Sequence, residues 1–145
     1  PHMDFGTIEF RMPEVQRSLL RTKMIIALTQ ALVHTASIEY ENGELIEDLS
    51  LEYLNDALWK ASRFDFNCKI MDVKNNKPIF MHNAILQMLD YSMNSLKYFG
   101  NEDVLNIVKE ILEVGTEADD QLKIFDLGGF EKLKKYLISD VKYFI

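Results

Sequence analysis

The chain has 145 residues, of which 48% are hydrophobic, 11% aromatic and 27% charged. This composition predicts one compact domain with a sizeable core, and it excludes a largely disordered chain. No stretch approaches the roughly 18 apolar residues that a membrane helix needs, and the net charge of −7 disfavours binding to nucleic-acid phosphates. We expect residues 1–3 to be a tag scar and residues 4–145 to be a single helical domain.

Residues 7–10 form a short extended candidate, and Pro13 suits the first turn of a long helix. Apolar residues then recur at spacings of three and four for more than 20 residues, which is typical of a helix. The second half of this helix is apolar almost all round, so we expect it to be deeply buried. The apolar positions are Val15, Leu19, Leu20, Met24, Ile26, Leu28, Leu32, Val33 and Ala36.

Two turn signals follow. Asn42-Gly43 predicts either a hairpin between residues 38–40 and 45–46 or a plain loop between helices. Ser50 caps the next predicted helix, in which Leu51, Leu54, Leu58 and Ala61 recur at helical spacing. The turn at residues 74–78 makes a second hairpin possible, because residues 66–70 alternate between apolar and polar.

Glycines divide the last 65 residues into helices. A helix over residues 85–99 ends at Gly100, and the next, capped by Asn101, ends at Gly115. Thr116 to Asp119 has the form of a capping box, and Gly128-Gly129 breaks the helix that follows. The fold class is therefore mainly α, with about six helices and one or two short hairpins possible before residue 81.

The stretch from Asn101 to Asp140 resembles an armadillo repeat. Residues 121–130 are similar to the segment between the first two helices of that repeat, and Leu133 and Leu137 match leucines of its second helix. The resemblance implies that the last three helices adopt an armadillo-like arrangement. Because one repeat cannot bury its apolar face alone, we expect it to stack on the helices before Gly100.

A weaker resemblance lies in residues 57–63, which are similar to the groove-lining helix of the armadillo family. In that family a Trp and an Asn four residues later clasp an extended peptide. Trp59 matches the Trp, whereas Arg63 stands in place of the Asn. The resemblance implies that Trp59 and Arg63 contribute to a binding surface.

Between Glu39 and Asp56 there are seven acidic residues and no Lys or Arg, and this segment accounts for the whole net charge. A solvated loop and helix start is the simpler interpretation, and a docking surface for a basic peptide or helix is the functional one. The candidate binding residues are Trp59, Arg63, Glu44, Glu47, Asp48 and Glu52.

Few residues carry recognisable chemistry. Cys68 is the only cysteine, which excludes an internal disulfide and favours an intracellular protein, cytoplasmic or nuclear. His34 and His82 lack a second ligand at the i+4 spacing of a helical metal site, and Gly128-Gly129 lacks the spacing and lysine of a phosphate loop. We therefore expect no metal, no cofactor and no catalytic residue. Cys68 is expected to be a buried thiol, and His34 a packed or hydrogen-bonded histidine.

The absence of a catalytic constellation favours a non-enzymatic protein-interaction module that acts as an adaptor, regulator or assembly factor. Its expected partner is another protein, such as a basic peptide or helix, and the aromatic end at residues 143–144 suggests self-association. The first alternative is a small viral or phage assembly or host-targeting protein that acts as a self-associating helical domain. The second is an enzyme built on Cys68, His34 or His82.

Overall fold

The computed structural model describes residues 4–44, 49–72 and 75–139. These residues form five α-helices, one 3-10 helix and a two-stranded sheet, so the predicted mainly α class is confirmed and the count of about six helices is not. The elements are α1 (Leu19–Glu41), α2 (Leu51–Phe64), η1 (Asp65–Asn67), β1 (Lys69–Asp72), β2 (Lys77–Phe80), α3 (Met81–Tyr98), α4 (Val104–Val114) and α5 (Glu117–Ile138).

Serine caps set the starts of α1 and α2. Ser18 accepts a hydrogen bond from the backbone N–H of Arg21, and Ser50 accepts one from the backbone N–H of Tyr53. The cap at Ser50 is confirmed. The predicted helix start at Pro13 is wrong, because residues 8–14 carry no regular secondary structure and α1 begins only after Ser18.

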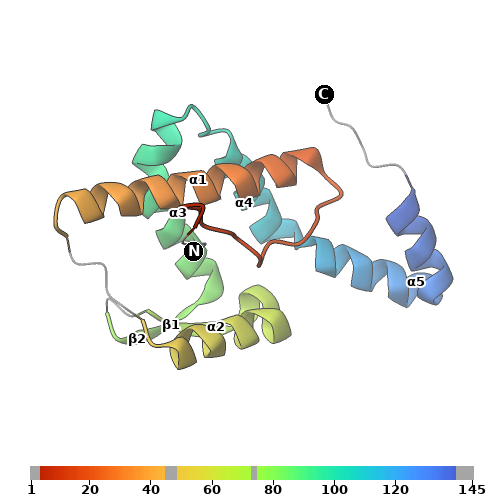
Figure 1. Ribbon diagram of the computed structural model, residues 1–145. Coiled ribbons are helices and arrows are strands. Elements are labelled where there is room, and N and C mark those ends of the chain that lie inside the picture. Colours follow the sequence, from red (N-terminus) through yellow and green to blue (C-terminus); the bar gives the residue numbers. More distant parts are fainter. Residues whose placement is uncertain (1–3, 45–48, 73–74, 140–145) are drawn as a thin grey trace.

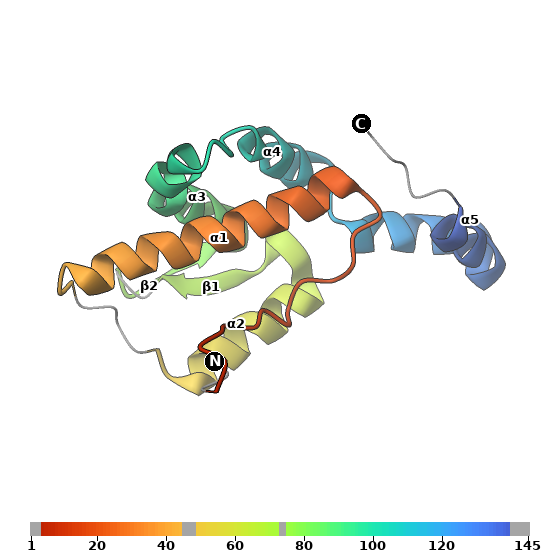
Figure 2. The same ribbon diagram turned by 45° about the horizontal axis from the view of Figure 1, so that its top comes forward.

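The core lies where α1 crosses α3 and α4 (Figure 1). Ala27 and Ala31 of α1 meet Leu96 of α3 and Val104 of α4, and all four are buried. The small alanine side chains allow the helices to approach closely. The main contacts of α1 are with α3 and α4, whereas the hairpin lies beside α2 (Figure 2).

The described residues cover the other side of α1 only in part. Ile26 is 63% exposed and Val33 is 39% exposed, although both belong to the half of the helix that is apolar almost all round. The prediction that this half is deeply buried is therefore wrong for one of its two faces. Among the described elements, α3 and α4 pack on the side of α1 that carries Ala27 and Ala31, which leaves apolar residues of the other side exposed.

The hairpin predicted between residues 66 and 80 is confirmed: β1 and β2 are antiparallel, with Lys69 opposite Phe80 and Asp72 opposite Lys77. The hairpin considered around Asn42-Gly43 is wrong, because residues 38–41 belong to α1. Its second strand, residues 45–46, lies outside the described residues.

Glycines end and bend the C-terminal helices as predicted. Gly100 follows α3 with φ of +66°, and Gly128 and Gly129 interrupt α5 with non-helical dihedral angles. The cap predicted at Asn101 is wrong, since α4 begins after Asp103 without a side-chain cap. The armadillo-like arrangement of residues 101–140 and the single domain over residues 4–145 stay predictions.

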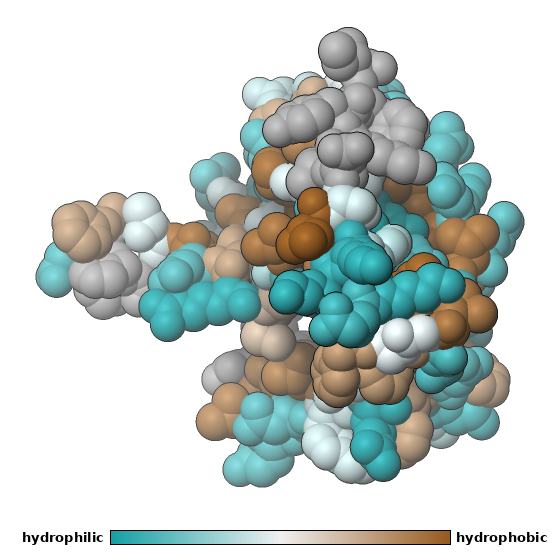
Figure 3. Space-filling view, turned by 90° about the vertical axis from the view of Figure 1, so that its right-hand side faces the viewer, coloured by the Kyte–Doolittle hydropathy of each residue, from teal (hydrophilic) through white to brown (hydrophobic). Residues whose placement is uncertain are grey.

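The bent helix α5 extends from the body formed by α1 to α4 (Figure 1). The face that carries it mixes hydrophilic and hydrophobic side chains, with a hydrophilic patch near its centre (Figure 3). Apolar residues of α5 such as Leu122, Leu127 and Phe130 are more than half exposed. In the part of the chain that the structure describes, no helix has the length and apolar character to span a membrane.

Candidate functional site

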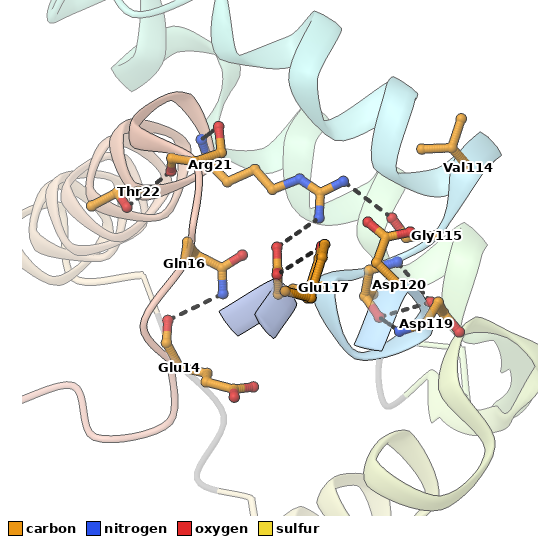
Figure 4. A network of polar contacts seen from close by, with 12 residues as sticks. Glu14, Gln16, Arg21, Thr22, Val114, Gly115, Glu117, Asp119 and Asp120 are labelled. Atoms are coloured by element: carbon orange, nitrogen blue, oxygen red, sulfur yellow. Dashed lines mark hydrogen bonds and ion pairs between the residues drawn. The ribbon is translucent and has the colours of Figure 1, made fainter. Parts of the chain in front are cut away.

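A polar network joins α1 to the junction between α4 and α5 (Figure 4). The guanidinium of Arg21 lies 3.7 Å from the carboxylate of Glu117 and donates a hydrogen bond of 3.5 Å to the carbonyl of Gly115. The two charged side chains are only 14% and 8% exposed. Because water is largely excluded there, the ion pair fixes the start of α5 against α1.

The bend in α5 brings its second half to the same network. The hydroxyl of Tyr136 donates to Glu117 over 3.4 Å, and the guanidinium of Arg17 lies 3.8 Å from the centre of the Tyr136 ring. Arg17 also donates to the carbonyl of Ser139 over 3.0 Å. The two ends of α5 are thus both held near the start of α1.

The first turn of α5 is closed by the predicted capping box, which the structure confirms. The backbone N–H and the hydroxyl of Thr116 donate to the carboxylate of Asp119 over 2.6 and 2.7 Å, and the N–H of Asp119 donates back to that hydroxyl. These hydrogen bonds lower the pKa of Asp119 below its ordinary value.

A polar pocket of about 460 Å³ lies beside the capping box and opens between two parts of the fold. One wall comes from η1, the end of β2 and the start of α3, and the other from the end of α4 and the first turns of α5. Its charged or titratable lining residues are Asp65, His82, Glu113, Asp119 and Lys123. Acidic and basic side chains therefore line the same pocket.

Asp65 is the most constrained of these residues. Its backbone φ of +52° is one that residues other than glycine adopt at a cost of about 1–3 kcal/mol, and such positions cluster at functional sites. Burial raises the pKa of Asp65 above its ordinary value, the N–H of Phe66 opposes the rise, and the negative charge of Asp119 adds to it. The two carboxylates repel each other across the pocket.

Each wall of the pocket also carries a basic side chain, His82 on one and Lys123 on the other. His82 is exposed in the first turn of α3. The ammonium of Lys123 donates to the carbonyl of Val114 over 3.4 Å and lies 3.6 Å from Asp120. Carboxylates attract an ammonium group, and the Lys123 ammonium attracts a carboxylate, so the pocket suits a small zwitterion. Within the described ranges no group of three or more His, Cys, Asp or Glu side chains could hold a metal ion.

The residues that the sequence singled out for binding lie elsewhere. Trp59 is 58% exposed on α2 and contacts the ring of Phe64 edge-to-face at 5.6 Å. Glu44, Glu52 and Arg63 are exposed, and Glu47 and Asp48 lie outside the described residues. None of the four described candidates, Trp59, Arg63, Glu44 and Glu52, lines the polar pocket. Their role as a binding surface stays a prediction.

Cys68 and His34 have the environments that the sequence predicts. The Cys68 thiol is buried, with 5% of the residue exposed. The ring nitrogen Nδ1 of His34 is 2.9 Å from the Ser95 hydroxyl, and its ring stacks on Tyr98 with centroids 4.8 Å apart.

Sequence reasoning missed the residues that form the site. None of Arg21, Asp65 and Glu117 is among the candidate residues that the sequence indicates. The one local signal was the capping box, which places Asp119 at a helix start. The other partners are about 50 to 95 positions distant in the sequence, and only the packing of α1, η1 and α5 brings them together.

The chain is similar to bacterial proteins that carry the provisional name glutamate–cysteine ligase 2. It is 26% identical over 144 residues to the protein of Solibacter usitatus, a match that covers 99% of this chain and 37% of that protein. The protein of Gloeobacter violaceus is 30% identical over 125 residues, covering 86% of this chain and 34% of its own length. The chain thus spans about a third of the curated relatives that it matches. No family model and no solved structure matches it.

These matches correct the functional prediction. The proteins named above are ligases by name, which contradicts the prediction of a non-enzymatic adaptor, regulator or assembly factor. The predictions that the chain is not an enzyme and that it acts through a partner protein or self-association are wrong for the same reason. The error arose because no catalytic constellation was recognised, and the residues of such a site need not be close in sequence.

Proposed function

We propose that the chain is a helical part of an enzyme related to glutamate–cysteine ligase, and that its polar pocket binds an amino-acid substrate. The observation that supports the proposal most strongly is the match to the Solibacter protein, which extends over 99% of this chain. A match of that extent involves every helix from α1 to α5 rather than one motif.

The charges around the pocket support an amino-acid ligand. An enzyme that joins glutamate to cysteine must bind two free amino acids, and each is a zwitterion near neutral pH. Asp65 and Asp119 repel each other, and an ammonium group between them would relieve that repulsion. Lys123 offers positive charge, and the His82 ring a hydrogen-bond donor, for the carboxylate of the same ligand.

Asp65 is also suited to proton transfer. An amine attacks a carboxyl carbon only after it loses its extra proton, so amide formation requires a base near the amine. A carboxylate with a raised pKa holds a proton more strongly than an ordinary aspartate, which makes it a better base. In the proposed pocket Asp65 binds the ammonium group and accepts its proton.

The test is a titration of the ¹⁵N-labelled chain with L-glutamate and, separately, with L-cysteine under reducing conditions. We expect saturable amide shifts at Asn67, His82 and Gly115 with at least one ligand, at concentrations up to about 10 mM, which is tenfold above the usual upper limit of KM. Asp65→Asn should weaken binding at least about tenfold.

Glu110→Gln is the matched control, because Glu110 is exposed on α4 and does not line the pocket. This variant should bind like the unaltered chain. Absence of saturable shifts for both ligands, or shifts that Asp65→Asn leaves unchanged, would contradict the assignment of the pocket.

A further inference from the structure

The outer face of α1 and the extended segment before it form an apolar surface that is separate from the polar pocket. A groove of about 830 Å³ lies between residues 6–13 and α1. Ile8 and Phe10 contribute to it from the extended segment, and Ile26 and Val33 contribute from the helix. All four side chains are between 39% and 63% exposed. We call these four residues the α1 groove.

The sequence of α1 indicates that this surface is normally covered. A helix that is apolar all round is a buried helix, whereas one that faces solvent carries a polar face. The core contacts of α1 come from Ala27 and Ala31, and they occupy one face only. The exposed apolar residues on the opposite face therefore need a second layer of protein.

The extended segment supports the same conclusion. In residues 7–12 the side chains alternate, with Thr7, Glu9 and Arg11 between Ile8, Phe10 and Met12, which is the pattern of a half-buried strand. The segment runs extended towards the start of α1 (Figure 2). Thr7 takes part in a β-bridge, and residues 8–10 carry no regular secondary structure. An extended segment of this kind can add to the edge of a sheet.

The lengths of the relatives indicate which polypeptide covers the α1 groove. The Solibacter protein has 63% of its length outside the part that matches this chain, since the match covers 37% of it. We infer that the α1 groove is the surface on which the remainder of the ligase polypeptide packs, with a sheet edge pairing to residues 8–12 and an apolar layer covering Ile26 and Val33. This inference rests on the proposed function.

The test co-expresses the chain with the part of the Solibacter ligase that lies outside the matched 144 residues, so that the two polypeptides fold together. We expect a one-to-one complex. Amides of residues 8–12 and of the outer face of α1 should exchange with deuterium more slowly in the complex than in the chain alone.

Ile26→Glu combined with Val33→Glu should weaken the complex at least about tenfold, because two charges would be buried at the centre of the interface. Both positions are exposed and glutamate is a good helix former, so the chain alone should keep its Tm. The matched control is Leu122→Glu with Leu127→Glu on α5, at positions 62% and 69% exposed. This control should leave the complex intact.

The inference is overturned if the two polypeptides do not co-purify, or if the slower exchange falls on α5 rather than on the α1 groove. It is also overturned if sedimentation equilibrium shows that the chain alone dimerises and that Ile26→Glu with Val33→Glu abolishes the dimer. A complex that forms through the α1 groove but binds neither glutamate nor cysteine would contradict the proposed function and leave this interface standing.

Discussion

The guanidinium of Arg21 lies 3.7 Å from the carboxylate of Glu117, and this ion pair links the first helix to the last. Both side chains are largely buried, and the Arg21 guanidinium also reaches the carbonyl of Gly115. Gly115 and its neighbour Asp119 line the polar pocket. The pair therefore holds one wall of the candidate site in place, although neither of its residues lines that pocket.

Removal of Arg21 should leave the buried carboxylate of Glu117 without its cationic partner. We expect Arg21→Ala to reduce the free energy of unfolding by about 3 kcal/mol, the lower end of the range for a broken buried ion pair. Urea unfolding followed by circular dichroism measures the change. Arg21→Met with Glu117→Leu should recover most of the loss, because no charge then remains buried. A double variant as unstable as Arg21→Ala would contradict this account of the pair.

The capping box should make stability depend on pH in the acid range. The pKa of Asp119 is lowered in the folded chain by the Thr116 hydrogen bonds, so its contribution is present above the unfolded value of 3.8. It is lost as the pH falls through the lower folded pKa. Asp119→Asn should therefore lower Tm near pH 6 and flatten its fall towards about pH 2. Asp126→Asn, at an exposed position of the same helix, is the control and should keep the original slope.

Thr116→Ala removes the other half of the capping box. We expect a loss of about 1 kcal/mol in the free energy of unfolding, as for other N-cap residues. The loss should be measurable by urea unfolding at neutral pH. A loss below about 0.3 kcal/mol would show that the cap contributes little, as happens when glycine replaces a cap.

Tyr91 should titrate at unusually high pH. Burial, the hydrogen bond of 2.5 Å to Glu39 and the charges of Glu39 and Glu44 raise the pKa of Tyr91 to about 12. Its contribution to stability is present below the unfolded value of 10.0 and is lost as the pH rises towards 12. Absorbance at the phenolate band should show a late-titrating component that Tyr91→Phe reduces. Tyr40→Phe, at a residue 78% exposed, is the control and should leave that component in place.

The bend in α5 should depend on the positive φ of Gly129. Gly129 has φ of +62° and ψ of −161°, a combination that essentially only glycine adopts, and an added Cβ would meet no atom within 4 Å. Gly129→Ala should therefore cost roughly 1–3 kcal/mol through backbone strain alone. Thermal unfolding of Gly129→Ala measures the loss, and an unchanged Tm would contradict a role for the positive φ.

Local signals predicted the local features of the fold. Ser50 and Thr116 cap helices because a side-chain oxygen can reach an N–H two or three residues later, whatever the rest of the chain does. The glycines at 100 and 128–129 end or bend helices for equally local reasons. Asn101 was expected to cap α4 on the same logic, and the helix instead starts after Asp103 without a side-chain cap.

The candidate site could not be predicted in this way. Trp59 and the acidic residues are conspicuous in sequence, yet the polar pocket is formed by Asp65, His82 and Asp119 from three separate elements. Asp65 becomes unusual only through its burial, its backbone strain and its repulsion by Asp119, and all three depend on packing. The absence of a recognised motif then led to the wrong functional class.

The sequence by itself determined that the chain is mainly helical, where several helices begin and end, and that Cys68 and His34 are packed inside. Those properties depend on periodicity, capping and local backbone freedom, which act over a few residues. Only the tertiary structure decided that Arg21 pairs with Glu117, that acids and cations share one pocket, and that one apolar face of α1 stays open. Those outcomes require contacts between residues far apart in the chain, whose pairing no local pattern encodes.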